Sequence, residues 1–265
     1  MSPKKKFGQN FITDKNLINK ILRDAKIEGK NVIEVGPGRG ALTEVIASTA
    51  KKVIAYEIDS DLSVFLDELT ERFDNLNIIY EDFLQAEFTS EEEWELIGNL
   101  PYYITTPIIF KFLENNQYNS ATIMIQKEVG DRIISGPNSK KYNALSVIIQ
   151  YLTKVTRIVN VSRKMFYPIP NVDSVVIRME KHKKREISLD LEPNFFDFVK
   201  GAFAQKRKTL VNNLSQYLGI SKSRIIALLK HFNYKDNIRA EQLNIEDFIV
   251  LFRGVYEEII WKSVR

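Results

Sequence analysis

Apolar and polar residues in the first 180 positions follow two alternating periods. After Thr13 and Asp14, either of which can cap a helix, apolar side chains recur every three or four positions over residues 17–25. A short apolar strand over residues 32–35 follows and ends in a glycine-rich turn. The chain is therefore expected to enter its fold through an amphipathic helix and a buried strand.

Strands and helices continue to alternate beyond this turn. The expected helices cover residues 41–48, 61–73, 106–113, 127–134 and 144–152, and the expected strands cover residues 53–57, 77–80, 95–98, 121–126, 155–161 and 174–179. Such alternation is typical of an α/β fold in which helices cover both faces of a parallel sheet.

A charged run at residues 180–186 interrupts this periodicity and has the composition of a solvated linker. From Phe195 to about Ile260 the pattern is wholly helical. We therefore expect an α/β domain over residues 1–180 and a small all-helical domain over residues 181–265. Their formal net charges, −2 and +6, favour a polyanionic partner for the second domain.

Composition removes several chemistries. The chain has no cysteine, which excludes disulfides, cysteine-based zinc sites, iron–sulfur clusters and a thiolate nucleophile. His182 and His231 are the only histidines and are too far apart in sequence to suggest a metal site or a hydrolase triad. No apolar run reaches the ~18 residues of a membrane span, and the basic start lacks the apolar part of a secretory signal. We expect a cytoplasmic protein with no metal and no membrane partner.

The glycine-rich turn is the first candidate binding element. Gly36 and Gly38 lie between a strand and a helix, where glycine lets the backbone approach a ligand and the helix N-terminus offers free N–H donors. Gly36, Gly38 and Ala41 also match the loose G-x-G-x-x-G/A dinucleotide pattern. A nicotinamide cofactor, another nucleoside ligand and a turn without a ligand all remain open on this segment alone.

Two carboxylates follow the next two strands. Glu57 ends the second strand, where it can accept hydrogen bonds from both hydroxyls of a ribose, and Asp82 ends the third beside the aromatic Phe83. Ligands of open α/β sheets bind at the carboxyl ends of the strands, so Gly36, Glu57 and Asp82 are expected at one mouth. Three such residues in succession favour a nucleoside ligand.

The segment Asn99-Leu100-Pro101-Tyr102, at the end of the fourth strand, separates the alternatives. The amine of adenine is a poor nucleophile because its lone pair is conjugated with the ring. The Asn99 side-chain oxygen and the Leu100 backbone carbonyl can accept its two hydrogens and direct the lone pair out of the ring plane. Pro101 stiffens the turn, and Tyr102 offers a face for base stacking. A nicotinamide dehydrogenase has no use for this group.

A second aromatic residue, Phe166, precedes a loop in which Pro168 and Pro170 favour an extended backbone. Enzymes that modify a base take it out of its stack and hold it between apolar or aromatic side chains. Phe166 is a candidate for the other face of such a base, with simple packing as the alternative.

These segments together resemble the KsgA family of ribosomal RNA adenine dimethyltransferases, over nearly the whole chain. The resemblance rests on residues 7–12, the loop from Glu34 to Gly40, Glu57, Asp82-Phe83, Asn99 to Tyr102, the loop from Phe166 to Ser174, and the run from Phe203 to Leu210. It implies a Rossmann-like sheet that binds S-adenosylmethionine, which leaves as S-adenosylhomocysteine, and a small helical C-terminal domain.

The resemblance also implies roles for single residues. Those expected to bind S-adenosylmethionine are Asn10, Ile12, Gly36, Gly38, Glu57, Asp82, Phe83 and Asn99. Glu57 would contact the ribose and Asp82 the cofactor adenine. Asn99, Leu100 and Tyr102 would hold the target adenine, with Phe166 stacked behind it.

The implied substrate is a pair of adjacent adenines near the 3′ end of 16S ribosomal RNA, in a precursor of the 30S subunit, with dimethylation at N6. The related Erm branch, which methylates 23S ribosomal RNA and confers macrolide resistance, is the main alternative. The run from Phe203 to Leu210 is more similar to KsgA. Tyr103 departs from the asparagine that many members have after the NLPY segment.

The helical domain supplies the candidate RNA contacts. One apolar helical seam is formed by Phe195, Phe198, Val199, Ala202 and Phe203. A helix continued beyond it would turn Lys206 toward this seam, so we expect a break near Gln205 that frees Lys206, Arg207 and Lys208 to meet phosphates. A solvated basic face is the simpler alternative. A non-catalytic assembly factor also remains possible, although pure binding needs no groups that orient an amine. No heptad pattern suggests anything beyond a monomer.

Overall fold

The computed structural model describes residue 4 and residues 9–263, and the chain forms two compact units. The first extends to Gly130 and resumes with Lys154–Lys181, and the second holds Asp131–Thr153 and the chain from His182 onward. The chain enters the second unit for the last time at His182, next to the boundary expected after residue 180. Residues 131–153, which the sequence pattern groups with the first domain, join the helical unit through aromatic contacts: the rings of Tyr142 and Tyr151 lie against Phe203 and Phe195.

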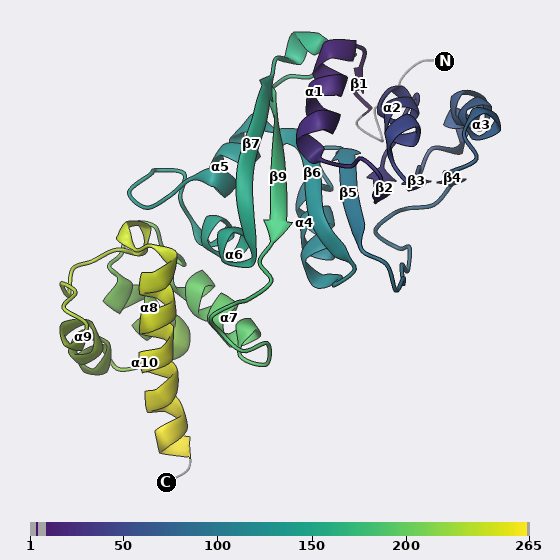
Figure 1. Ribbon diagram of the computed structural model, residues 1–265. Helices are drawn as coiled ribbons and strands as arrows, with labels where there is room; N and C mark the ends of the chain where they lie inside the picture. Colours follow the sequence, from purple (N-terminus) through teal and green to yellow (C-terminus); the bar gives the residue numbers. More distant parts are fainter. Residues whose placement is uncertain (1–3, 5–8, 264–265) are drawn as a thin grey trace. The chain divides into compact units, whose positions relative to one another are not determined.

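A seven-stranded sheet in the order β4-β3-β2-β5-β6-β9-β7 forms the centre of the first unit (Figure 1). Its strands are β2 (Asn31–Val35), β3 (Lys52–Tyr56), β4 (Leu76–Ile79), β5 (Trp94–Asn99), β6 (Tyr118–Gln126), β7 (Thr153–Val161) and β9 (Ser174–Lys181). A separate pair joins β1 (Phe11–Ile12) to β8 (Phe166–Tyr167) in antiparallel register. Every expected strand is present.

The strand directions correct one expectation. β4, β3, β2, β5 and β6 run parallel, whereas β9 pairs with β6 antiparallel. The sheet is therefore mixed rather than wholly parallel. A parallel pair needs a long crossover, usually a helix. β9 instead follows β7 through a 3-10 turn and β8, with no α-helix between them, so it can enter the sheet in the opposite direction.

The expected helices also form. In the first unit they are α1 (Lys15–Ala25), α2 (Ala41–Thr49), α3 (Ser63–Arg72), preceded by a 3-10 turn (Ser60–Leu62), and α4 (Thr105–Glu114); α5 (Lys127–Ile134) leads into the second unit. A further 3-10 turn covers Arg163–Met165. Asp14 caps α1, since its carboxylate accepts a hydrogen bond from the Leu17 N–H. Helices α1, α2 and α3 bury Ile21, Ile46 and Leu66 in one shared core with one face of the sheet.

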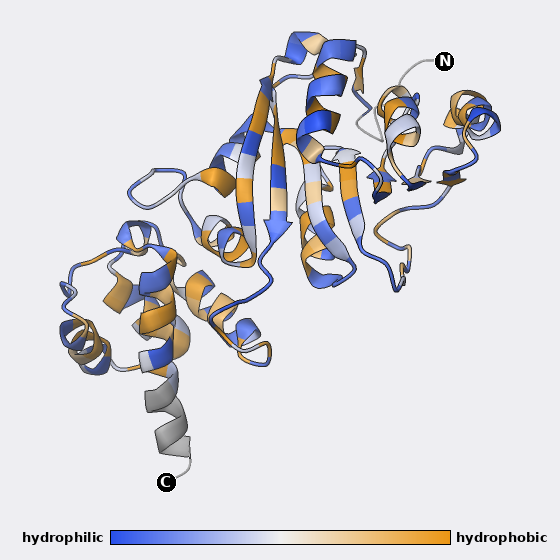
Figure 2. Ribbon diagram, viewed as in Figure 1, coloured by the Kyte–Doolittle hydropathy of each residue, from blue (hydrophilic) through white to orange (hydrophobic). Residues whose placement is uncertain are grey.

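The amphipathic pattern that predicts these helices is visible on the structure. Figure 2 shows hydrophobic and hydrophilic residues side by side on the helices of both units. In Figure 1, α1 lies in front of the sheet and α4 behind it. The sheet is thus covered on both faces, which leaves the ends of its strands as the places where polar groups can meet a ligand.

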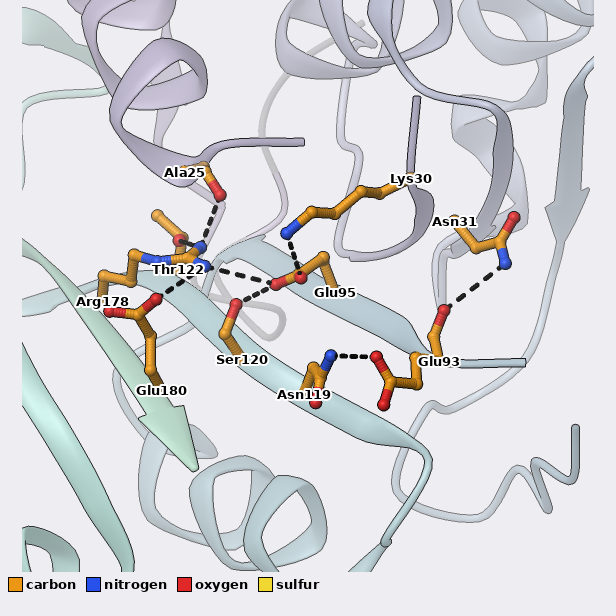
Figure 3. A network of polar contacts seen from close by, with 10 residues as sticks. All are labelled: Ala25, Lys30, Asn31, Glu93, Glu95, Asn119, Ser120, Thr122, Arg178 and Glu180. Carbon is orange, nitrogen blue, oxygen red and sulfur yellow. Dashed lines mark hydrogen bonds and ion pairs between the residues drawn. The ribbon is translucent and has the colours of Figure 1, made fainter. Parts of the chain in front are cut away.

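A charged network built around the buried Arg178 and Glu95 lies at the amino end of β5 (Figure 3). The guanidinium of Arg178 lies 3.6 Å from the Glu95 carboxylate and 3.3 Å from that of Glu180. It also donates a hydrogen bond to the backbone carbonyl of Ala25, the last residue of α1. The Lys30 ammonium lies 2.7 Å from Glu95. Two cations thus face two carboxylates, and the network joins α1 to β5 and β9.

The second unit is helical, as expected. Its helices are α6 (Ala144–Leu152), α7 (Glu192–Ala202), α8 (Leu210–Leu218), α9 (Lys222–His231) and α10 (Ile245–Ser263), with a 3-10 turn at Ala240–Gln242. Rings of Phe195 and Phe198 on α7 pack against Phe252 on α10. The predicted break after α7 is confirmed, because the helix ends at Ala202 and α8 begins at Leu210.

Candidate functional site

A cavity of about 410 Å³ lies at the carboxyl ends of the parallel strands in the first unit. Its walls come from the turns after β2, β3, β4 and β5, and from residues 9–13, which we call the N-terminal strap. All the residues expected to bind a cofactor line it: Asn10, Ile12, Gly36, Gly38, Glu57, Asp82, Phe83 and Asn99. Its volume falls in the range of about 300–1,000 Å³ typical of small-molecule sites. Phe7 and Gly8, which also carried the resemblance, lie outside the described residues.

The glycine turn after β2 requires its glycines. Gly36 and Gly38 have φ angles of 71° and 61°, in the left-handed region that side chains disfavour. A Cβ on Gly38 would lie 3.0 Å from the ring of Phe11, which belongs to the strap. The turn and the strap therefore approach each other closely, and larger residues would push them apart.

Glu57 lines the cavity just after β3, where two backbone N–H groups hold its carboxylate. Gly38 N donates to Oε2 at 3.0 Å, and Asp59 N donates to Oε1 at 2.9 Å. Burial raises the pKa of Glu57, and these backbone hydrogen bonds oppose that rise. The glycine turn and the carboxylate are thus fixed relative to each other.

Glu34 lies beneath the same turn, on β2, and is 2% exposed. Burial raises its pKa to about 8; the Thr43 hydroxyl acts against this shift, and the Glu57 carboxylate acts with it. The sequence pattern places Glu34 in the strand before the turn and in the loop motif, and assigns it no role of its own. Its burial could not be read from the pattern of a short apolar strand.

Asp82 and Phe83 follow β4 and form the next part of the wall. The Asp82 carboxylate accepts a hydrogen bond from Leu84 N at 2.9 Å. The Phe83 ring packs edge-on against Tyr56 at 5.4 Å, and the Lys111 ammonium lies 5.0 Å from its centroid. This places a fixed carboxylate beside a flat apolar surface, which suits an adenine ring.

The Asn99 to Tyr102 turn closes the cavity at the end of β5. The Asn99 amide nitrogen donates to the backbone carbonyl of Asn10 at 2.7 Å. Leu100 N donates to the Met124 carbonyl at 3.1 Å, which ties the turn to β6. The Tyr102 hydroxyl shares a 2.9 Å hydrogen bond with Ser174, the first residue of β9, and burial raises its pKa. Asn99, Leu100 and Tyr102 all line the cavity.

The two aromatic residues of β8 divide between core and cavity. Phe166 is buried in the core shared with α1 and is not part of the cavity wall. Its neighbour Tyr167 lines the cavity and is 62% exposed. Alternate residues of a strand face opposite sides, so only one of the two can point to the cavity. Tyr103, which departs from the family pattern, is a second exposed ring on the wall.

The basic run of the second unit lies between α7 and α8. Lys206, Arg207 and Lys208 are all exposed, and the Lys206 ammonium donates a hydrogen bond to the Lys140 carbonyl at 3.1 Å. The break in the helix that frees these residues was predicted from the apolar seam. The contact of Lys206 with the Lys140 carbonyl, 66 positions earlier in the chain, was not predicted.

Neither a metal site nor a membrane span is found in the described part of the chain. Over residue 4 and residues 9–263, His, Asp and Glu side chains form no group of three or more that could hold a metal ion. Within the same residues, no helix combines the length and apolar character that crossing a membrane requires.

The fold is that of a Rossmann-like methyltransferase, with a cavity at the carboxyl ends of its parallel strands. A family model described as ribosomal RNA adenine dimethylase matches residues 1–255, and the chain belongs to this family. "Ribosomal RNA small subunit methyltransferase A" of the Aster yellows witches'-broom phytoplasma is 51% identical over 253 residues, which cover 92% of this chain and 93% of that protein. The protein of the same name from Mycoplasmopsis pulmonis is 43% identical and covers 95% and 98% of the two chains.

Solved structures agree with this assignment. A dimethyladenosine transferase from Plasmodium falciparum has a TM-score of 0.82 at 25% identity and covers 94% of this chain and 98% of its own. The 23S rRNA methyltransferase ErmE has a TM-score of 0.78 at 26% identity, with 93% and 100% covered. The fold is therefore shared by both branches that the sequence left open.

Proposed function

We propose that this protein is the enzyme that transfers methyl groups from S-adenosylmethionine to N6 of adenine in small-subunit ribosomal RNA. The observation that carries the proposal is the Asn99 to Tyr102 turn on a cavity whose other walls suit a nucleoside cofactor. The family model and relatives at 43–51% identity support the same reaction and the small subunit. Dimethylation of two adjacent adenines near the 3′ end is the specific form of the reaction that we propose.

The residues around the cavity fit S-adenosylmethionine. The Glu57 carboxylate would accept hydrogen bonds from the two ribose hydroxyls, and the Asp82 carboxylate would accept one from the amine of the cofactor adenine beside Phe83. The left-handed glycines at 36 and 38 keep side chains away from the backbone that the cofactor approaches. When bound, the cofactor supplies a methyl group on a sulfonium, which is an electrophilic carbon.

The target adenine is held by three groups of the turn. The Asn99 side-chain oxygen and the Leu100 carbonyl accept the two N6 hydrogens, which directs the nitrogen lone pair out of the ring plane. Tyr102 stacks on the base, a contact worth about 1–3 kcal/mol per base in single-strand complexes. The ring of Tyr102 is held in place by its hydrogen bond to Ser174. Most of the acceleration is positional, and well-oriented groups reach effective molarities of about 10⁵–10⁸ M.

The second unit contributes the electrostatic part of RNA binding. Lys206, Arg207 and Lys208 are exposed together on the connection between α7 and α8. Such residues contact phosphates and position the RNA without reading its sequence. The proposed substrate is the ribosomal RNA of a 30S precursor, with the protein acting as a monomer in the cytoplasm during ribosome biogenesis.

The Erm alternative is not favoured. ErmE shares the fold at 26% identity, whereas relatives named for the small subunit are up to 51% identical. A purely structural assembly factor is also disfavoured, because binding alone needs no pair of acceptors directed at an amine.

Transfer of radiolabelled methyl from S-adenosylmethionine tests this function. Unmethylated small subunits and, separately, protein-free 23S RNA serve as substrates, and the labelled nucleosides are identified. We expect label in N6,N6-dimethyladenosine of the small-subunit RNA, and its formation at a strongly reduced but measurable rate after Asn99→Ala. Label confined to 23S RNA would assign the protein to the Erm branch, and no label in either RNA would refute methylation.

A further inference from the structure

The N-terminal strap is anchored to one buried carboxylate. Asp59 lies two residues beyond Glu57 and is 4% exposed. The Lys4 ammonium lies 2.6 Å from Asp59 Oδ1, and Gln9 Nε2 donates to Oδ2 at 2.8 Å. Lys4, which precedes the strap, also pairs with Asp61, and its backbone N–H donates to Gln9 Oε1 at 2.8 Å. Burial raises the pKa of Asp59, but the hydrogen bonds from Lys4 and Gln9 bring it below its usual range, so the carboxylate is charged at neutral pH.

The strap holds the amide of Asn99 in one orientation. The Asn10 carbonyl can only accept, so the 2.7 Å contact requires the Asn99 nitrogen to face the strap. The opposite orientation would bring two oxygens to the same distance. The Asn99 oxygen is therefore left for another donor, and this is the atom that the target amine needs.

A chain of contacts connects Asp59 to Asn99. The Asp59 carboxylate accepts a hydrogen bond from Gln9, and the backbone carbonyl of the next residue, Asn10, accepts one from Asn99. Phe11 and Ile12, further along the strap, pair with β8. Asp59 is also tied to the cofactor side of the cavity, since its backbone N–H donates to Glu57. Asp59 itself is not on the cavity wall, so it acts only through these neighbours.

We propose that Asp59, through Lys4 and Gln9, is a positioning residue that fixes the strap so that the Asn10 carbonyl holds the Asn99 amide oxygen toward the target amine. This inference rests on the proposed function. It assigns the strap a role in the chemical step, in addition to its contribution of Asn10 and Ile12 to the cofactor site.

The test compares single-turnover methylation of small subunits at saturating S-adenosylmethionine. Variants Asp59→Asn, Lys4→Met and Gln9→Ala remove the anchor from its two sides. Lys51→Met is the matched control, because Lys51 forms an exposed ion pair with Glu92 that is not part of the anchor. We expect the anchor variants to lose on the order of 10- to 100-fold in rate, as displaced catalytic groups do, and Lys51→Met to lose less than about twofold.

The same variants are then made in the Asn99→Ala background. If the contacts of Asp59 with Lys4 and Gln9 act through Asn99, their loss does not lower the residual methylation rate of Asn99→Ala any further. Such non-additivity is expected of coupled residues. Equal losses in both backgrounds, or no loss in either, would overturn the inference. Lys4→Met keeps the test decisive if Asp59→Asn does not fold, since Lys4 is 30% exposed. An inactive wild type would instead refute the proposed function.

Discussion

At the scale of single residues, the strand that leads into the glycine turn carries a carboxylate held away from water. Glu34 has a pKa of about 8 in the folded chain, set mainly by burial. Between its unfolded value near 4.5 and about 8 the folded state binds the extra proton. The free energy of unfolding therefore falls as pH rises through this interval, because stability declines wherever the folded state holds more protons than the unfolded state.

Glu34→Gln removes this titration and keeps the shape of the side chain. We expect the unfolding free energy of the variant to vary less between pH 5 and pH 8 than that of the wild type, by an amount on the order of a few kcal/mol. Chemical denaturation at several pH values measures the difference. Glu44→Gln on α2, an exposed carboxylate, is the control. Parallel pH curves for Glu34→Gln and wild type would contradict this account.

Phe166 and Tyr167 illustrate how neighbouring residues separate in role. Phe166→Ala empties a buried position and is expected to lower the unfolding free energy by about 3–5 kcal/mol. Tyr167→Ala removes an exposed ring from the cavity wall and should change stability by less than about 0.5 kcal/mol. Denaturation of both variants measures this contrast. Should Phe166→Ala retain full stability, Phe166 would not be the core residue that its burial indicates.

At the scale of elements, the charged network positions α1 and hence the strap that precedes it. Arg178 is 7% exposed and faces Glu95 and Glu180 while it binds the carbonyl at the end of α1. The network lies at the amino end of β5, whereas the cavity lies at its carboxyl end. Its role is therefore to fix elements and not to contact a ligand.

Arg178→Met tests this role. The variant leaves the buried Glu95 with one fewer cation, and removing one partner of a buried ion pair costs about 3–5 kcal/mol. Arg157→Met, an exposed residue of β7, is the matched control and should cost less than about 0.5 kcal/mol. Urea denaturation gives both values. Similar stabilities for the two variants would show that the network contributes no more than a surface charge.

At the scale of the whole molecule, the proposed cofactor and RNA contacts lie in different units. The triple variant Lys206→Ala, Arg207→Ala, Lys208→Ala should weaken binding to small-subunit RNA. It should also flatten the dependence of binding on salt by roughly 0.7–0.9 in log–log slope for each phosphate that the protein no longer neutralises. Affinity for S-adenosylmethionine should not change. Binding titrations at several salt concentrations, with RNA and with cofactor, measure these quantities, and an unchanged salt slope would remove these residues from the RNA surface.

Local pattern predicted most of the elements, and pattern together with the family resemblance indicated the candidate residues. Helical and strand periods depend on neighbours along the chain, so α1, β2 and the break after α7 followed from spacing. Gly36, Glu57, Asp82 and Asn99 share one cavity because the carboxyl ends of parallel strands meet at one edge of a sheet. This shared position can be predicted from the order of strands and turns along the chain alone.

Only the tertiary structure decided the features that depend on contacts between distant residues. Three such features follow from packing that no local period encodes. β9 runs antiparallel to β6, Phe166 is buried whereas Tyr167 is exposed, and residues 131–153 group with the helical unit. The bond between Asn99 and Asn10 spans 89 positions, and the anchor at Asp59 lies 50 positions from Gln9. The sequence by itself therefore determined the candidate groups for the chemistry, and the folded chain decided what holds them in place, because such contacts form only when distant segments pack together.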